Sequence, residues 1–323
     1  MADERPVAVV TALDDITADM VIAELNQRGV PVIRFNPTDL GTGLSMSARF
    51  GTDALPLEGS LRTPSRRAEL DAIRSVYWRR ATWPDFADLD PGDARWVAAQ
   101  VRHGLGGVLY ALPGCLYANH PLANQRADVK PLQLAAAQRL GFLVPPTLVS
   151  NRLEDIKDFA GTHGDVVYKA LRWTAHSRGG VGHTTWTEPV EAADFDASVE
   201  AAPVLVQARV DKVADLRVTV VGEQVFAVRI DSDLLDWRTD YDALSYTVVN
   251  LPEDLEHALV GFLAHFGLAF GCFDLCVRRT DESPVWLELN PNGQWGWLED
   301  ETGLPLTAAF ADLLQEGTRH ASE

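Results

Sequence analysis

The sequence predicts a mixed α/β protein in which two or three lobes share a cleft. A strand, a helix and a second strand open the chain, at residues 7–10, 16–29 and 31–36. Toward the carboxyl end, a β-rich stretch over residues 203–230 precedes an amphipathic helix and two further strand-like runs. Because 323 residues exceed the usual size of one hydrophobic core, we expect these patterns to belong to separate lobes.

Three lobes are expected along the chain. Strands alternating with helices favour a parallel sheet covered by helices, which we assign to residues 1–120. Within that lobe, residues 94–112 are expected to form a helix broken around its glycines. We assign residues 121–202 to a central lobe and residues 203–323 to a third lobe with an antiparallel sheet. The first strand is not followed by the GxGxxG pattern of a dinucleotide-binding fold.

Composition argues against several partners. The formal charge is −18, from 28 Lys and Arg against 46 Asp and Glu, whereas nucleic-acid binding needs a basic surface. The sequence has no uninterrupted run of about 18 apolar residues, so no membrane span is expected. No signal-peptide pattern is visible, and three cysteines without a CxxC pair fit a reducing compartment. We therefore predict a cytoplasmic protein that binds neither nucleic acid nor membranes.

Carboxylate and amide side chains alternate along the last two strand-like runs. Alternation places Asp274 on one face of the first run, and Trp286, Glu288 and Asn290 together on one face of the second. If the two runs pair as a hairpin, their oxygen ligands converge on one spot and suit Mg²⁺. The alternative is that Asp274 is a solvated charge on an edge strand and that residues 290–293 form only a turn.

Two lysines stand where anions commonly bind. Lys130 opens a helix, and Lys169 ends a strand before a glycine-rich stretch at residues 178–182. The glycines would let backbone N–H groups approach a phosphate closely, although the P-loop pattern is missing. Solvated lysines and a surface hairpin are the alternatives. The apolar face of the helix that Lys130 opens is assigned to Leu132, Ala135, Ala136 and Leu140.

Arginines on the β-rich lobe are candidates for contacts with anionic substrates. Arg217 and Arg229 lie within strand-like runs, where a cation on an inner sheet face needs an anionic partner such as a triphosphate. Arg238 follows in a loop and could hold the carboxylate of an acceptor. The alternative for the two strand arginines is pairing with a neighbouring acid, Asp215, Asp231 or Asp233.

The order of these features from Asn119 onward resembles the ATP-grasp superfamily. More narrowly, the run WLELNPNGQWGWLE, with VYKAL, QARVDKVADLRVTVVG and DWR, is similar to the ATP-grasp maturases of ribosomal peptides. Those enzymes make graspetides, which are peptides cross-linked through their side chains. The resemblance implies an ATP-grasp fold with an N-terminal Rossmann-like pre-ATP-grasp lobe, a central lid subdomain and a C-terminal antiparallel-sheet subdomain.

The resemblance also implies roles for individual residues. The ATP phosphates would be contacted by two lysines and three loop glycines, Lys130, Lys169, Gly179, Gly180 and Gly182. The adenine hinge would comprise Gln207, Ala208, Arg209, Val210 and Asp211. Ala208 stands where many relatives have Glu, so its contact must come from elsewhere, with Asp211 as a candidate. Arg217 would stabilise the γ-phosphate, and Asp274, Glu288 and Asn290 would hold Mg²⁺.

The activity implied is an ATP-dependent carboxylate ligation on a ribosomally made precursor peptide. An Asp or Glu side chain would become an acyl phosphate, which a Thr or Ser hydroxyl or a Lys amine attacks to form an ω-ester or ω-amide. Arg217, Arg229 and Arg238 are the predicted catalytic residues, and a homodimer is expected from relatives. Two alternatives are a ligase that adds a free amino acid, like glutathione synthetase or the ribosomal-protein glutamyl ligase, and a peptide-binding scaffold with a decayed ATP site.

Overall fold

The N-terminal lobe is built on a parallel sheet, as the sequence predicts. The computed structural model describes residues 4–51, 56–172, 176–178, 181–183 and 185–317, with only the backbone described in the two short segments. The sheet has the order β2-β1-β6-β7, and its strands are β1 (Val7–Val10), β2 (Val32–Phe35), β6 (Ser75–Trp78) and β7 (Leu116–Ala118). Helix α1 (Ile16–Gln27) joins the first two strands, and Asp15 caps its amino end.

A small antiparallel sheet and a long helix complete this lobe. The small sheet contains β3 (Ser45–Phe50), β4 (Leu57–Arg62) and β5 (Arg67–Glu69). Helix α2 (Pro91–Tyr110) is continuous, so the predicted break around its glycines is wrong. Gly106 faces a ring, because a Cβ built there would lie 3.0 Å from Trp83. Close packing therefore explains this glycine, at a helix cost of about 1 kcal/mol relative to alanine.

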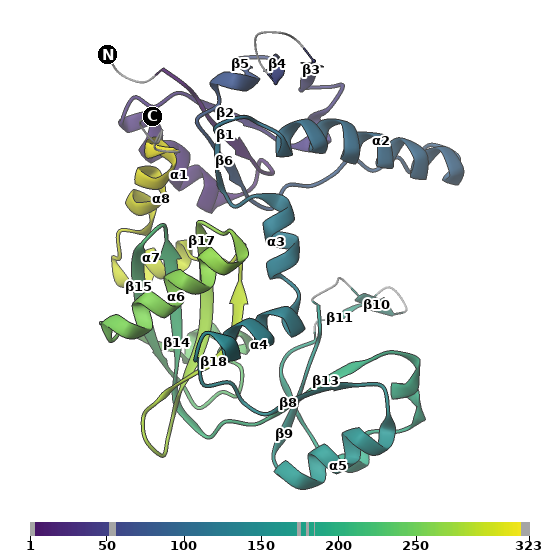
Figure 1. Ribbon diagram of the computed structural model, residues 1–323, viewed down its shortest axis with the longest axis vertical. Helices are drawn as coiled ribbons and strands as arrows, with labels where there is room; N and C mark the ends of the chain where they lie inside the picture. Colours follow the sequence, from purple (N-terminus) through teal and green to yellow (C-terminus); the bar gives the residue numbers. More distant parts are fainter. Residues whose placement is uncertain (1–3, 52–55, 173–175, 179–180, 184, 318–323) are drawn as a thin grey trace.

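Two short helices lead from the first lobe to the central lobe (Figure 1). They are α3 (Pro121–Ala127) and α4 (Lys130–Arg139). The predicted apolar face of α4 is right only for Ala136, which is buried with Gln133 and Ala137. The assignment of Leu132 and Leu140 is wrong, since they are 46% and 40% exposed. The buried amide of Gln133 hydrogen-bonds to the backbone of Leu289 on a neighbouring strand, so a polar residue occupies the buried face.

The central lobe is a four-stranded antiparallel sheet, β12-β9-β13-β8, packed against α5 (Leu153–His163). Its strands are β8 (Thr147–Ser150), β9 (Val166–Lys169), β12 (Glu188–Val190) and β13 (Val204–Ala208). A short hairpin, β10 (His176–Arg178) and β11 (Val181–His183), is inserted before β12. Because β13 pairs with β8 and β9, the sheet of this lobe extends past residue 202. The domain limits remain predictions.

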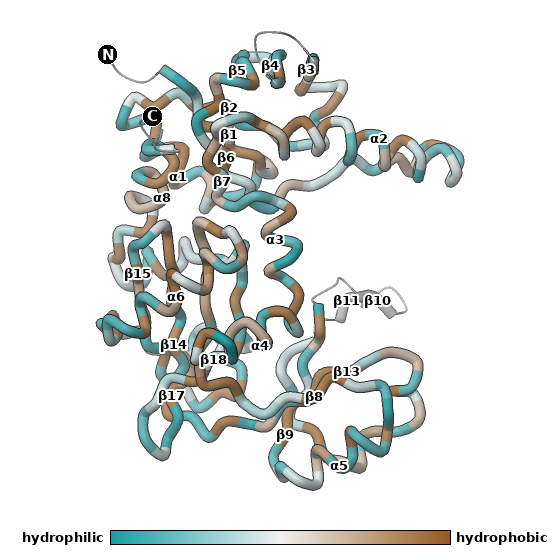
Figure 2. Tube along the Cα trace, in the orientation of Figure 1, coloured by the Kyte–Doolittle hydropathy of each residue, from teal (hydrophilic) through white to brown (hydrophobic). Residues whose placement is uncertain are grey.

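The third lobe carries a five-stranded antiparallel sheet, β16-β15-β14-β17-β18. Its strands are β14 (Lys212–Val221), β15 (Gln224–Asp231), β16 (Ser245–Val249), β17 (Phe270–Arg278) and β18 (Pro284–Asn290). Helix α6 (Glu253–Phe266) packs on one face through Phe262, which contacts Phe273 and Trp286. Figure 2 shows how apolar residues concentrate in the sheets rather than in the connecting loops. Among the described residues, no helix is long and apolar enough to span a membrane.

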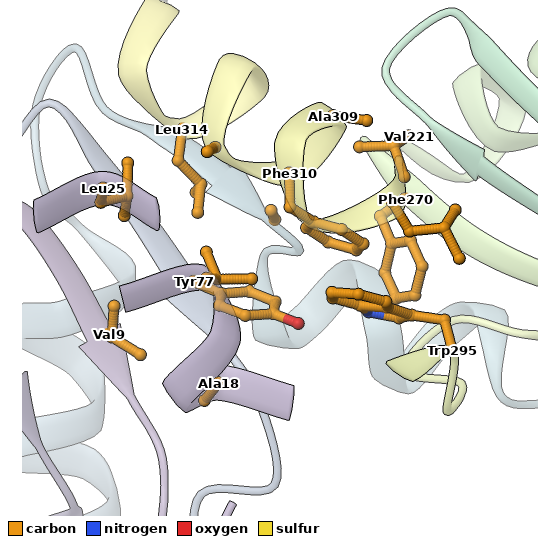
Figure 3. Close-up of a cluster of buried hydrophobic side chains, with 14 of the residues drawn as sticks. Val9, Ala18, Leu25, Tyr77, Val221, Phe270, Trp295, Ala309, Phe310 and Leu314 are labelled. Carbon is orange, nitrogen blue, oxygen red and sulfur yellow. The ribbon is translucent and has the colours of Figure 1, made fainter. Parts of the chain in front are cut away.

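The end of the chain returns to the first lobe and joins it to the third. Helix α7 (Gly296–Thr302) leads into α8 (Leu306–Glu316), which packs against α1. The ring of Phe310 stacks on Trp295 at 4.6 Å and also contacts Tyr77 and Phe270 (Figure 3). One hydrophobic core therefore spans the parallel sheet and the third lobe. Trp295 is fully buried in this core.

Candidate active site

A cleft of about 250 Å³ lies between the central and third lobes. Its walls come from the start of α4, the ends of β9 and β13, the strands β17 and β18, and the loop around Trp237. Six cations line it, namely Lys130, Lys169, Arg172, Arg209, Lys212 and Arg238. Five carboxylates line it as well, namely Asp128, Asp215, Asp236, Asp274 and Glu288. The lining is therefore net positive by one charge in a chain of formal charge −18, which favours an anionic ligand.

The predicted hairpin of oxygen ligands forms at one wall of the cleft. Strands β17 and β18 pair antiparallel, with Asp274 opposite Glu288 and Cys272 opposite Asn290. The Asn290 amide donates to Asp274 Oδ2 over 3.0 Å, which leaves its own carbonyl oxygen for a cation. The three predicted metal ligands therefore converge on one face of the sheet.

A β-bulge changes one part of that prediction. Asp274 pairs with Glu288 while Leu275 pairs with Trp286, so Leu287 is the extra residue on β18. The bulge reverses the alternation, and Trp286 points to the opposite face, into the core beneath α6. Placing Trp286 on the face of Glu288 and Asn290 was therefore wrong. Leu287 joins Glu288 in the lining of the cleft.

Cations surround the carboxylate of Glu288. Lys130 donates to its Oε2, and Arg238 Nη1 donates to its Oε1 over 3.0 Å. Burial raises the pKa of Glu288, but Lys130 and Arg238 outweigh burial and hold that pKa below its usual value. Lys169 faces the same carboxylate, and burial lowers the pKa of its ammonium group. The two predicted phosphate lysines thus meet in one cleft, Lys130 from the start of α4 and Lys169 from the end of β9.

Arg217 lies on the same face of the sheet, next to the β17–β18 hairpin that carries the three predicted metal ligands. Its position on β14 pairs with Asp274 on β17, and its Nη1 donates to Asp274 Oδ1 over 2.8 Å. The guanidinium is almost fully buried, and its Nη2 donates to the backbone carbonyl of Gln294 over 3.0 Å. Arg217 therefore places a positive charge beside the three predicted metal ligands, and solvent has little access to that charge.

Of the other two predicted arginines, Arg238 lines the cleft and Arg229 does not. Arg238 reaches the cleft as predicted, and its Nε and Nη2 donate to the two carboxylate oxygens of Asp236, each over 2.8 Å. Arg229 does not reach the cleft, because it pairs across strands with Leu216 and so lies on the opposite sheet face from Arg217. It pairs with Asp231 at 2.7 Å, and pairing with a neighbouring acid was the alternative prediction for Arg229. This geometry gives no support to the catalytic role predicted for Arg229.

The predicted adenine hinge mostly lines the cleft. Gln207, Ala208, Arg209 and Val210 do so at the end of β13. Asp211 does not: its carboxylate pairs with Arg279 at the surface over 2.9 Å, so it cannot substitute for the missing Glu as predicted. In the predicted phosphate loop, Gly182 lies on β11 opposite Ser177. Gly179 and Gly180 lie outside the described residues.

Two buried polar residues of the site, Gln133 and Asp236, were not predicted from the sequence, and a third, Asp215, was predicted only as a possible partner of a strand arginine. Gln133 donates to the carbonyl of Leu289 and accepts from its N–H, over 2.8 and 2.9 Å, and so fixes β18 beside its ligands. Asp236 orients Arg238 and also accepts from the N–H of Thr187 over 3.3 Å. Asp215 lines the cleft two residues before Arg217, and burial raises its pKa to about 6. Only Asp215 had a signal, since strand alternation puts it on the face of Arg217.

Solved structures share this fold. The RiPP-associated ATP-grasp ligase of Chryseobacterium gregarium, in complex with ADP and a leader and core peptide, is 27% identical, with a TM-score of 0.87 over 98% of each chain. The macrocyclase MdnC of Microcystis aeruginosa, bound with precursor peptide MdnA, is 26% identical. Its TM-score is 0.84 over 96% of this chain and 98% of that one. The chain is an ATP-grasp ligase.

More distant ligases share the fold alone. D-alanyl-alanine synthetase A of Vibrio cholerae is 14% identical and has a TM-score of 0.58. No protein-family model matches the ligase, and no curated protein matches it. The predicted fold class, with a parallel N-terminal sheet, a central lobe and an antiparallel C-terminal sheet, is confirmed. The roles of its site residues remain predictions.

Proposed function

We propose that the ligase activates Asp or Glu side chains of a ribosomally made precursor peptide with ATP and joins them to hydroxyl or amine side chains of the same peptide. The observation that carries the proposal is the meeting of Lys130, Lys169, Arg238 and the Asp274–Glu288 pair in one cleft. The similarity to two ATP-grasp ligases in complex with precursor peptides supports the choice of substrate.

Asp274, Glu288 and Asn290 fit a Mg²⁺ ion that also binds phosphate oxygens. The described residues contain no cluster of three Asp, Glu, His or Cys side chains, but Mg²⁺ needs only one or two carboxylates when phosphates and waters complete its shell. Glu288 pairs with Lys130 and Arg238 of the cleft, and Asp274 pairs with the buried Arg217 beside it. When bound, the ion supplies charge neutralisation on the transferring phosphoryl group. Lys130 and Lys169 would then turn toward the phosphates of ATP, and Arg217 would act on the γ-phosphate from its place beside Asp274.

The chemistry proceeds in two balanced steps. A peptide carboxylate oxygen, held by Arg238, attacks the γ-phosphorus, and the bond to ADP breaks. The hydroxyl or amine then attacks the acyl carbon, and phosphate leaves as its bond to that carbon breaks. Asp215 is our candidate base for the proton that the nucleophile releases, because it is buried, lines the cleft and contacts Lys212 over 2.5 Å. The residues of the site thus supply charge, orientation and a proton acceptor.

A pH dependence follows from the role proposed for Asp215. Its carboxylate must be ionised to accept a proton, and burial raises its pKa to about 6. We expect kcat to fall tenfold per pH unit below about pH 6 and to level off above it. Asp215→Asn should lower kcat and remove this limb of the profile. A limb that persists unchanged in Asp215→Asn would assign the titration to another group.

Mass spectrometry of the enzyme with Mg²⁺, ATP and candidate acidic, Thr-rich peptides encoded near its gene tests the proposed function. We expect the loss of one water per cross-link, dependent on ATP, with ADP and phosphate formed in equal amount. Mild base then cleaves esters and leaves amides. A gain of the mass of a free amino acid would instead identify a small-substrate ligase, and an unmodified peptide would contradict the proposal.

The proposal also covers the compartment and the oligomeric state of the enzyme. We place the enzyme in the cytoplasm, where precursor peptides are made and ATP is abundant. A homodimer is part of the proposal, and light scattering of the purified protein at micromolar concentration tests it. A mass of one chain would contradict the dimer without affecting the assignment of the reaction.

A further inference from the structure

The segment that follows the metal ligands, residues 290–295, is held from the side of the N-terminal lobe. Asn119, which precedes α3, donates to the carbonyl of Pro291 over 2.8 Å. At the other end of the segment, Arg79 donates to the side-chain oxygen of Gln294. We call residues 290–295 the ligand loop.

Arg79 is an unusual anchor because its side chain is entirely buried. It follows β6, where its backbone N–H donates to the carbonyl of Val10, and its guanidinium pairs with Asp15 at 2.9 Å. Asp15 is also fixed, since it caps α1 through the N–H of Ala18 and accepts from the hydroxyl of Thr11. The guanidinium therefore has one defined orientation in which to meet Gln294. Desolvation offsets much of the attraction within a buried ion pair, so net stability is a weak reason for burying Arg79 here.

The ligand loop connects Arg79 to Arg217. Gln294 accepts from Arg79 through its side chain and from Arg217 through its backbone carbonyl, the latter over 3.0 Å. The loop also lies tightly on this site, because a Cβ built on Gly293 would lie 3.0 Å from Arg217 Nη2 and 2.6 Å from Cys272 Cβ. The Nε of Arg217 is buried without a hydrogen bond. Its orientation against Asp274 thus depends strongly on the carbonyl of Gln294.

We propose that Arg79 is a positioning residue which, through the side chain of Gln294, holds Arg217 against Asp274. The inference rests on the proposed function for its kinetic consequence, but its structural consequence is independent of any substrate. It makes the N-terminal lobe part of the active site, since the charge that stabilises the reacting phosphoryl group is aligned from β6. Displacements of about 1 Å at such a group can change rates by roughly 100-fold.

Variants of Gln294 test the inference without leaving Asp15 unpaired. Gln294→Leu removes the acceptor for Arg79, whereas Gln294→Glu retains one and keeps the contact. We expect Gln294→Leu to lower kcat by roughly 10- to 100-fold with little change in the KM for peptide, and Gln294→Glu to stay within about threefold of wild type. Arg28→Met is the control, because it removes the contacts of Arg28 with Glu24 on α1 and with Asp312 on α8 but does not touch the ligand loop.

A double-mutant cycle and crystal structures separate positioning from general stability. In an Arg217→Lys background, the further loss from Gln294→Leu should shrink to less than about twofold, because both changes act on one contact. Losses that multiply would overturn the inference. In the crystal structure of Gln294→Leu, Arg217 should leave Asp274, and in that of Gln294→Glu it should remain. An Arg217 that keeps its contact in Gln294→Leu would also overturn the inference, even if no peptide were ever modified.

Discussion

Asp274→Asn is expected to lower the rate of peptide condensation by about 1,000-fold or more. The substitution keeps the size of the side chain but removes the negative charge that faces Arg217 at 2.8 Å and that would bind Mg²⁺. Asn290 would lose its charged acceptor on the same residue. Because the buried Arg217 loses its ion partner, we expect a lower melting temperature together with a lower affinity for Mg²⁺ and ATP. Formation of ADP and loss of water from the peptide should decline together.

Asp281→Asn is the matched control for this variant. Asp281 lies at the turn of the same β17–β18 hairpin, where it pairs with Arg278 and remains about half exposed. Because surface pairs contribute little to stability, this variant should retain the wild-type rate and melting temperature. A condensation rate for Asp274→Asn within tenfold of wild type would show that Asp274 does not hold the ion. The hairpin would then be structural, which was the alternative to the ligand site.

The sequence predicted the site best where strand alternation or element order was sufficient. Asp274, Glu288 and Asn290 converge because two neighbouring strands pair, which is a local event of known periodicity. Lys130 and Lys169 were found from their positions at element ends, and both reach the cleft. These predictions needed no knowledge of how the lobes are arranged.

The failures have equally specific causes. The bulge at Leu287 reversed one position of a regular alternation, and no residue type marks it in the sequence. The face of α4 was misassigned because a buried glutamine that bonds to a backbone looks, in sequence, like a surface residue. Arg79 and Gln294 are 215 positions apart and meet only after the lobes pack. Contacts of this kind depend on tertiary structure, which periodicity cannot supply.

Arg238→Ala is expected to abolish cross-linking, by at least about 100-fold, while ATP binding changes little. Arg238 lies in the loop that leads to β16 and forms a bidentate ion pair with Asp236 of the same loop. It also contacts Glu288 of the β17–β18 hairpin at 3.0 Å, and so links the loop to that hairpin. Lys130 continues to pair with Glu288 in the variant, which preserves the nucleotide side of the site. A carboxylate substrate would lose the cation that orients it. ADP binding by calorimetry and cross-linking by mass spectrometry measure the two effects separately.

The loss of Arg238 also leaves Asp236 buried without its cation, so stability must be measured beside activity. The double variant Asp236→Asn/Arg238→Gln removes both charges and should recover the melting temperature but not the cross-linking. Arg229→Ala is the second control, because Arg229 lies on the opposite face of the sheet and contacts Asp231. Cross-linking should survive in Arg229→Ala and fail in Arg238→Ala. The reverse result would mean that the peptide carboxylate approaches from the face of the sheet that carries Arg229 and not from the cleft.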